Sequence, residues 1–175
     1  MPRGPSPRLR SWWLAAAVLV SLITVTVERC RSDDTAGPPT WTVRTVHDGD
    51  TVTCIDPEGR PHKIRLLGID CPEMAQAHGR ESSQALAGKV GNRRVAVVSR
   101  GFDQYGRLLG TLWIDGRDIN REMVEEGHAW VFGRIAPNPE LVAAESAARV
   151  GRRGLWRDGN PEEPSRWRSE HPRQP

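Results

Sequence analysis

Residues 43–68 contain three short runs in which apolar and polar side chains alternate. Turn residues separate the runs, with Asp48-Gly49 between the first and second and Pro57–Arg60 between the second and third. Because the side chains of a strand point alternately to its two faces, this pattern predicts three strands that each bury one face. Turns this short predict that the strands are antiparallel neighbours.

The rest of the central region combines two more strands with helices. The strands are predicted at residues 93–99 and 108–114, and the helices at residues 79–90, 118–127 and 138–150. Asn138 followed by Pro139 is typical of a helix start, because asparagine caps the first backbone N–H groups and proline needs no partner there. Five short antiparallel strands with one inserted helix fit a small closed or partly open barrel, so we predict an α+β fold that is mainly β.

The N-terminal region has the layout of a secretion signal. Residues 1–10 are basic and rich in proline, and residues 11–27 carry no charge. No clear cleavage site follows, so we expect an uncleaved signal anchor rather than a cleaved peptide. The rest of the chain is then expected outside the cytoplasm, held to the membrane through residues 11–27, or secreted if the segment is cleaved.

These patterns divide the chain into four parts. Residues 1–31 form the basic N-terminus with its signal anchor or signal peptide, and residues 32–40 form a linker. Residues 41–157 form the folded domain. Residues 158–175 contain four prolines, and we expect this tail to be disordered.

Composition narrows the class of protein without identifying it. A chain of 175 residues allows one domain of ordinary size, and a hydrophobic content of 37% excludes a membrane protein with several spans. Three cysteines exclude a disulfide-rich miniprotein. The net charge of +3 permits an anionic partner but does not argue for one.

Acidic side chains gather at one end of the first three predicted strands. Asp48 and Asp50 flank a glycine, and Asp70 and Glu73 follow the third strand. Carboxylates brought together repel one another unless a cation is bound, and ligands that are all oxygen suit calcium or magnesium. The alternative is a pair of turns whose aspartates cap the backbone, and the spacing alone does not decide between the two.

Two arginines favour a functional site. Arg65 lies in the third predicted strand between two apolar residues, an awkward place for a charge unless it points into a site, and Arg107 lies at the entrance to the fifth strand. A metal ion, two guanidinium groups and a spare carboxylate are the parts needed to cleave a phosphodiester, because cations stabilise charge on phosphoryl oxygens and a carboxylate can activate water.

The sequence resembles the thermonuclease family, the staphylococcal-nuclease-like domains. The resemblance covers nearly all of residues 41–157. Its motifs are Val46–Thr51, Ile64–Glu73, His78–Ser82, Asp103–Arg107 and Arg153–Trp156.

The resemblance implies a five-stranded Greek-key β-barrel of the OB type with three α-helices and a nuclease site that uses one calcium ion. By motif position, Asp50, Asp70 and the backbone carbonyl of Cys71 look like the calcium ligands. Asp48 looks like a residue that supports these ligands without binding the ion itself. Glu73 looks like the residue that positions or deprotonates water. The remaining catalytic residues, which look like the phosphate clamp, are Arg65 and Arg107.

The resemblance also implies the reaction. We expect a sugar-nonspecific hydrolase of the thermonuclease type that acts on DNA and RNA without sequence preference, cuts the bond between phosphorus and the 5′ oxygen, and leaves 3′-phosphate ends. We expect a monomer, which contacts the membrane through residues 11–27 if that segment is not cleaved. The alternative is a noncatalytic OB-fold nucleic-acid-binding module tethered to the membrane.

The chain departs from the family pattern at two places. Cys71 replaces a threonine, which leaves open a disulfide with Cys54 or two free thiols. Two tyrosines of the family fall at Gly133 and Ile135 here, so base stacking would depend on Tyr105 or on neighbouring aromatic residues. We expect Phe132 and three of the tryptophans to pack in the core. These tryptophans are Trp113, Trp130 and Trp156.

Overall fold

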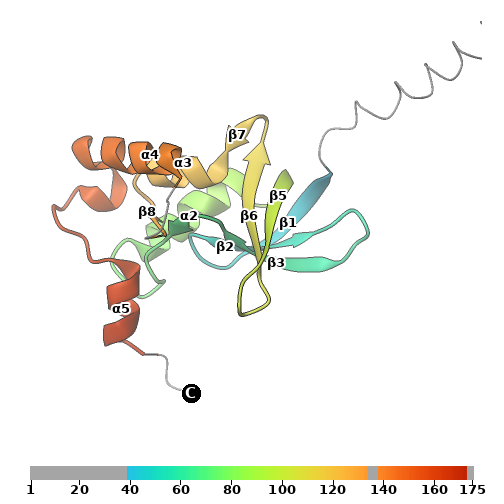
Figure 1. The fold of residues 1–175 in the computed structure, drawn as a ribbon, viewed down its shortest axis with the longest axis horizontal. Helices are drawn as coiled ribbons and strands as arrows, with labels where there is room; N and C mark the ends of the chain where they lie inside the picture. The colour runs from blue at the N-terminus through green and yellow to red at the C-terminus, as the bar shows by residue number, and fades with distance from the viewer. Residues whose placement is uncertain (1–38, 134–137, 173–175) are drawn as a thin grey trace, which may run out of the picture. The chain divides into compact units, whose positions relative to one another are not determined.

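A computed structural model describes residues 39–133 and 138–172. Five strands close into a barrel (Figure 1): β1 (Thr40–Val46), β2 (Thr51–Ile55), β3 (Pro61–Leu66), β5 (Arg94–Phe102) and β6 (Leu108–Ile114). Their order is β3-β2-β1-β5-β6, and a parallel pairing of β3 with β6 closes the sheet on itself. This is the predicted OB-type barrel, and each of the five strands overlaps the run that predicted it.

Alternation along the strands builds the core of the barrel. In β3 the side chains of Ile64 and Leu66 are buried, and Arg65 between them points to the other face. In β6 the side chains of Leu112 and Ile114 are buried, whereas Trp113 is exposed. The prediction that Trp113 packs in the core is therefore wrong, because the two-residue period of a strand turns it outward.

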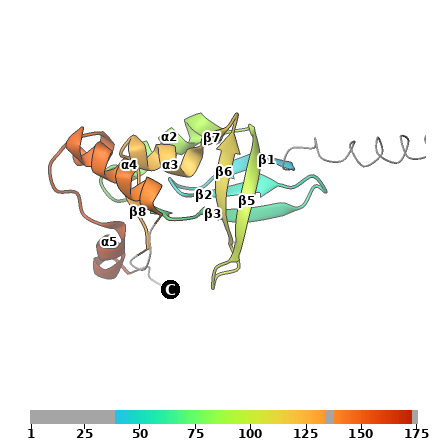
Figure 2. The ribbon, with the colours of Figure 1, turned by 45° about the horizontal axis from the view of Figure 1, so that its top comes forward.

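Three helices pack beside the barrel: α2 (Gly79–Val90), α3 (Ile119–Glu125) and α4 (Pro139–Val150). All three occur where the sequence predicted them, and Asn138 caps α4 by accepting a hydrogen bond from the backbone N–H of Glu140 at 2.9 Å. Figure 2 shows α3 and α4 next to each other, beside the barrel strands.

A second, smaller core lies under α4. Trp130 and Trp156 are both buried, and their rings meet edge to face with centroids 4.4 Å apart. Trp156 belongs to the short 3₁₀ helix η1 (Gly154–Trp156). The prediction that Trp130 and Trp156 pack in the core is confirmed. The same prediction for Phe132 is wrong, because its side chain is exposed.

Short strand pairs extend the barrel toward the helices. β4 (Ile69–Asp70) pairs with β8 (Trp130–Val131), and β7 (Arg117–Asp118) pairs with the end of β6. The first of these pairs fixes the backbone of Asp70, which lies opposite Trp130.

The C-terminal segment differs from its prediction. Residues 158–175 were expected to be disordered, but a helix, α5, spans Pro164–Glu170. Pro164 occupies the first turn, where its missing N–H costs nothing, and Arg166 pairs with Glu170 one turn later at 2.9 Å. Pro164 therefore begins a helix instead of preventing one.

The predicted membrane segment, residues 11–27, lies outside the described residues. Among the helices of residues 39–133 and 138–172, none combines the length and the apolar character needed to cross a bilayer.

Candidate functional site

The turn between β1 and β2 directs Asp50 inward. Asp48 accepts a hydrogen bond from the backbone N–H of Asp50 at 3.0 Å, which shapes the turn. The Asp50 carboxylate is buried and accepts hydrogen bonds from the Thr51 hydroxyl at 3.0 Å and from the backbone N–H of Cys71 at 2.8 Å. Asp48 thus caps the backbone of the turn before Asp50, and Asp50 connects the β1–β2 turn to the segment after β4.

Arg65 joins the two buried carboxylates. Its Nη1 lies 2.9 Å from Asp50 Oδ2, and its Nη2 lies 2.8 Å from Asp70 Oδ1. The guanidinium also donates to the backbone carbonyl of Ile69 at 2.9 Å. The structure therefore brings together Arg65, Asp50 and Asp70, the three residues that the motifs indicated. The guanidinium of Arg65 forms ion pairs with both carboxylates.

Glu73 follows Asp70 by three residues and is held through its backbone. Its N–H donates to the side-chain carbonyl of Gln76 at 3.1 Å, and its own carbonyl accepts from the Gln76 N–H at 2.8 Å. The Glu73 side chain is partly exposed, in contrast to Asp50 and Asp70. It is thus the most accessible carboxylate of the three and the one best placed to meet water.

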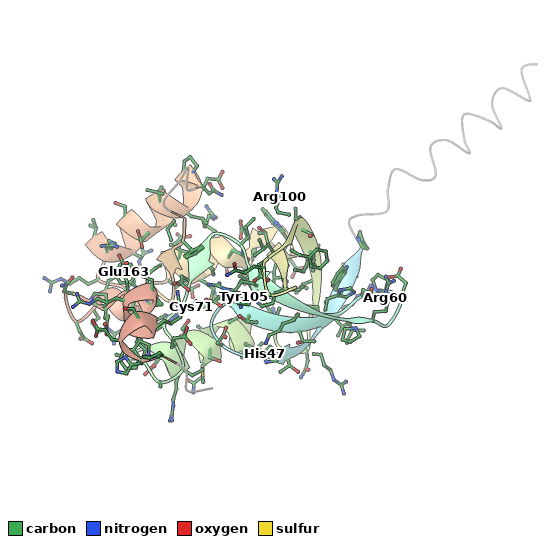
Figure 3. The ribbon with its side chains drawn as sticks, turned by 60° about the horizontal axis from the view of Figure 1, so that its bottom comes forward. His47, Arg60, Cys71, Arg100, Tyr105 and Glu163 are labelled. Carbon is green, nitrogen blue, oxygen red and sulfur yellow. The ribbon has the colours of Figure 1, made fainter. Side chains whose placement is uncertain are left out.

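Arg168 reaches this site from α5, and the sequence analysis predicted no role for it. Its Nη2 lies 2.8 Å from Asp70 Oδ2, and its Nη1 lies 3.2 Å from Asp70 Oδ1 and 3.1 Å from Glu73 Oε1. In Figure 3 the labelled Cys71, next in sequence to Asp70, lies beside α5, in agreement with these contacts. The helical spacing of Arg166 and Glu170 after a proline was the signal that an ordered segment follows the domain.

Arg107 and Tyr105 lie in the turn between β5 and β6. The Arg107 Nε is 2.7 Å from Asp103 Oδ2, and its guanidinium carbon lies 5.5 Å from the centre of the Tyr105 ring. Leu109, two residues later, pairs with Arg65 in the β3–β6 register, so Arg107 belongs to the same face of the sheet as Arg65. The structure pairs Arg107 with Asp103, and it leaves Tyr105 exposed.

The electrostatics of the site are those of buried acids near a shared cation. Burial raises the pKa of Asp50 to about 7, although Arg65 acts in the opposite direction. Hydrogen bonding to Asp70 raises the pKa of Arg168 above its usual value, so that this guanidinium stays charged. Burial therefore penalises the negative charge of Asp50, and a nearby cation would compensate for that penalty.

The donor chemistry of the site fits a hard divalent cation. Within the described part of the chain, no group of three or more histidine, cysteine, aspartate or glutamate side chains is assembled to hold a metal ion. Asp50 and Asp70 nevertheless contact neighbouring nitrogens of one guanidinium, which brings the two carboxylates close to each other. Carboxylate and carbonyl oxygens completed by water are the ligands that calcium and magnesium accept.

The two cysteines of the described residues are free thiols. Cys54 and Cys71 are both buried, and no disulfide joins them. Burial raises the pKa of Cys54 to about 12 and that of Cys71 well above its usual value. Gly49 packs against Cys71 so closely that a Cβ there would lie 2.8 Å from the Cys71 Cβ. Cys71 thus acts as a small core side chain that supports the turn before Asp50.

Sequence comparisons agree with this architecture. The family model described as "Staphylococcal nuclease homologue" matches residues 63–158. An "Uncharacterized endonuclease" of Haemophilus influenzae is 38% identical over 123 residues, which are 70% of this chain and 69% of that protein. "Protein ParB" of Escherichia coli is 42% identical over 135 residues, covering 70% of this chain and 75% of that protein.

A plant relative shows the same domain in a larger protein. The "Probable staphylococcal-like nuclease CAN3" of Oryza sativa subsp. japonica is 39% identical over 119 residues, which are 67% of this chain and 32% of the rice protein. This chain therefore spans about a third of the rice relative.

The fold and the site define an OB-type barrel that carries paired aspartates and an arginine at one edge. With the matches above, the chain belongs to the family of staphylococcal nuclease homologues.

Proposed function

We propose that this chain is a calcium-dependent nuclease that hydrolyses DNA and RNA and leaves 3′-phosphate ends. Membership of a nuclease family supports the proposed hydrolase activity. The observation that carries the proposal is the pair of buried carboxylates, Asp50 and Asp70, joined by Arg65 with the accessible Glu73 beside them. A module that only bound nucleic acid would gain nothing from burying two negative charges in the site.

The cation would be held by Asp50, Asp70 and the backbone carbonyl of Cys71. When bound, calcium supplies positive charge that stabilises the phosphoryl oxygens as negative charge grows on them. Glu73 takes the proton of the attacking water, whose oxygen then forms the new bond to phosphorus. The bond from phosphorus to the 5′ oxygen breaks, and that oxygen takes up a proton.

The arginines contribute charge and orientation. Arg107 would bind a phosphate oxygen by exchanging Asp103 for the substrate, which its location at a turn permits. Arg65 is buried against Asp50 and Asp70, so its first role is to hold those carboxylates in place. Tyr105, exposed in the same turn as Arg107, offers a ring for base stacking.

Glu73→Gln tests the chemical step. The full chain is incubated with plasmid DNA and with RNA, first with calcium and then with a chelator. We expect hydrolysis that needs calcium and a loss of about 100-fold or more in rate for Glu73→Gln, because the amide cannot accept the proton. Glu58→Gln, in the exposed β2–β3 turn, is the matched control and should retain full activity.

Two outcomes would contradict the proposal. One is hydrolysis that survives chelation, and the other is a Glu73→Gln variant as active as the unmodified chain. Binding of either nucleic acid without any hydrolysis would instead support the noncatalytic module.

We also propose that the nuclease acts outside the cytoplasm as a monomer. The basic residues 1–10 followed by the uncharged residues 11–27 support a membrane anchor or, if cleaved, secretion. Fractionation of the full chain into membrane and soluble pools distinguishes these two forms.

A further inference from the structure

The C-terminal helix α5 places a cation on the carboxylates that a metal ion would need. Arg168 contacts both oxygens of Asp70, at 2.8 Å and 3.2 Å, and reaches Glu73 Oε1 at 3.1 Å. These are charge-assisted hydrogen bonds, and the Asp70 pair engages both terminal nitrogens of the guanidinium. Arg168 thus binds the site as an internal ligand would.

The segment before α5 is anchored beside the same site. The Gln76 Nε2 donates to the backbone carbonyl of Glu162 at 2.7 Å, while Gln76 Oε1 accepts from the Glu73 N–H at 3.1 Å. Gln76 and Pro164 are both buried. One amide side chain therefore connects the Glu73 backbone to the start of the helix, and this contact directs Arg168 toward the carboxylates.

The docked state is held lightly enough to be reversed. The Arg168 side chain is 40% exposed, so its ion pairs are partly screened by water. Some contacts of α5 lie within the segment itself, such as the stacking of Trp167 on His171, and these hold the helix rather than its docking. No residue of α5 belongs to the hydrophobic core of the barrel, so release of α5 would leave that core intact.

A divalent cation and Arg168 exclude each other at Asp70. A bound calcium ion lies about 2.3–2.6 Å from its ligand oxygens, so it would stand next to a guanidinium that contacts the same two oxygens. Two positive charges at that separation repel strongly in a partly buried site.

We propose that α5 is a displaceable internal ligand of the site, in which Arg168 occupies Asp70 and Glu73 until a divalent cation replaces it. This inference rests on the proposed function only in taking Asp70 as a ligand of the cation. The helix then lowers the affinity of the site for the cation, and cation binding undocks the helix.

Calcium titration calorimetry on the full chain, without nucleic acid, tests the competition. We expect Arg168→Ala to bind calcium about tenfold more tightly than the unmodified chain, and Arg168→Gln to do the same if the alanine variant folds poorly. Arg166→Ala is the matched control, because it removes the same charge from the same helix but pairs with Glu170 instead of the site. Its affinity should stay within about twofold.

Hydrogen exchange of the backbone amides in residues 162–171 gives a second readout. We expect their exchange to accelerate when calcium saturates the unmodified chain, because α5 leaves the site. Equal or weaker calcium affinity in both Arg168 variants would overturn the proposal, as would unchanged exchange at saturating calcium or no calcium binding at all. Tighter binding by the variants without any nuclease activity would support α5 as a ligand and refute the nuclease.

Discussion

Replacing Arg65 by glutamine should leave Asp50 buried without the cation that compensates it. The side chain of Arg65 is 13% exposed and that of Asp50 is 8% exposed, so solvent screens this pair little. Removing one partner of such a pair costs about 3–5 kcal/mol. Asp70 keeps Arg168 as a second partner, so we expect the lower end, about 3 kcal/mol.

Urea denaturation followed by circular dichroism, with a chelator present, measures this loss. For a domain of this size, about 3 kcal/mol lowers the melting temperature by about 10 °C. Arg44→Gln, an exposed arginine on β1, is the control and should change stability by less than about 0.5 kcal/mol. The double variant Asp50→Asn with Arg65→Gln should recover about 2 kcal/mol, because the charge that lost its partner is gone. A loss below about 1 kcal/mol, or no recovery in the double variant, would refute this reasoning.

Two further predictions concern stability. The hydrogen bonds with Arg117 lower the pKa of Glu122 to about 2. Glu122→Gln should therefore cost about 1 kcal/mol of unfolding free energy at pH 7. The difference between the variant and the unmodified chain should shrink as the pH falls from about 4.5 to about 2. A difference that persists at pH 2 would exclude this ion pair as its source. Gly49→Ala should cost about 1–3 kcal/mol in urea denaturation, because its Cβ would overlap the Ser82 hydroxyl and the Cys71 side chain. Gly88→Ala, where a Cβ meets open space, should not destabilise the chain.

The barrel was readable because local rules and the tertiary fold agree in it. The alternation around Ile64 and Leu66 placed β3, and the same alternation turned Arg65 outward into the site. Trp113 is exposed, contrary to the prediction, because it lies between two buried residues of β6. Size is a weak guide to burial on a strand, since every second side chain faces outward.

The candidate site was predictable in its members but not in their pairing. Motif positions selected Asp50, Asp70 and Arg65, and the structure joins all three. Motif positions did not indicate that Arg107 pairs with Asp103 in its own turn. Salt-bridge choice depends on distances of a few ångströms, and a sequence of residue types does not contain those distances.

By itself, the sequence determined the strands, the three helices beside the barrel and the carboxylates that gather at one edge, because these follow from side-chain periodicity and short turns. Only the tertiary structure decided that Arg168 lies on Asp70 and Glu73. That contact joins residues almost a hundred positions apart, and the hydrogen bond from Gln76 to Glu162 holds the chain beside it. Long-range contacts of this kind depend on how the whole fold closes, which no local pattern encodes.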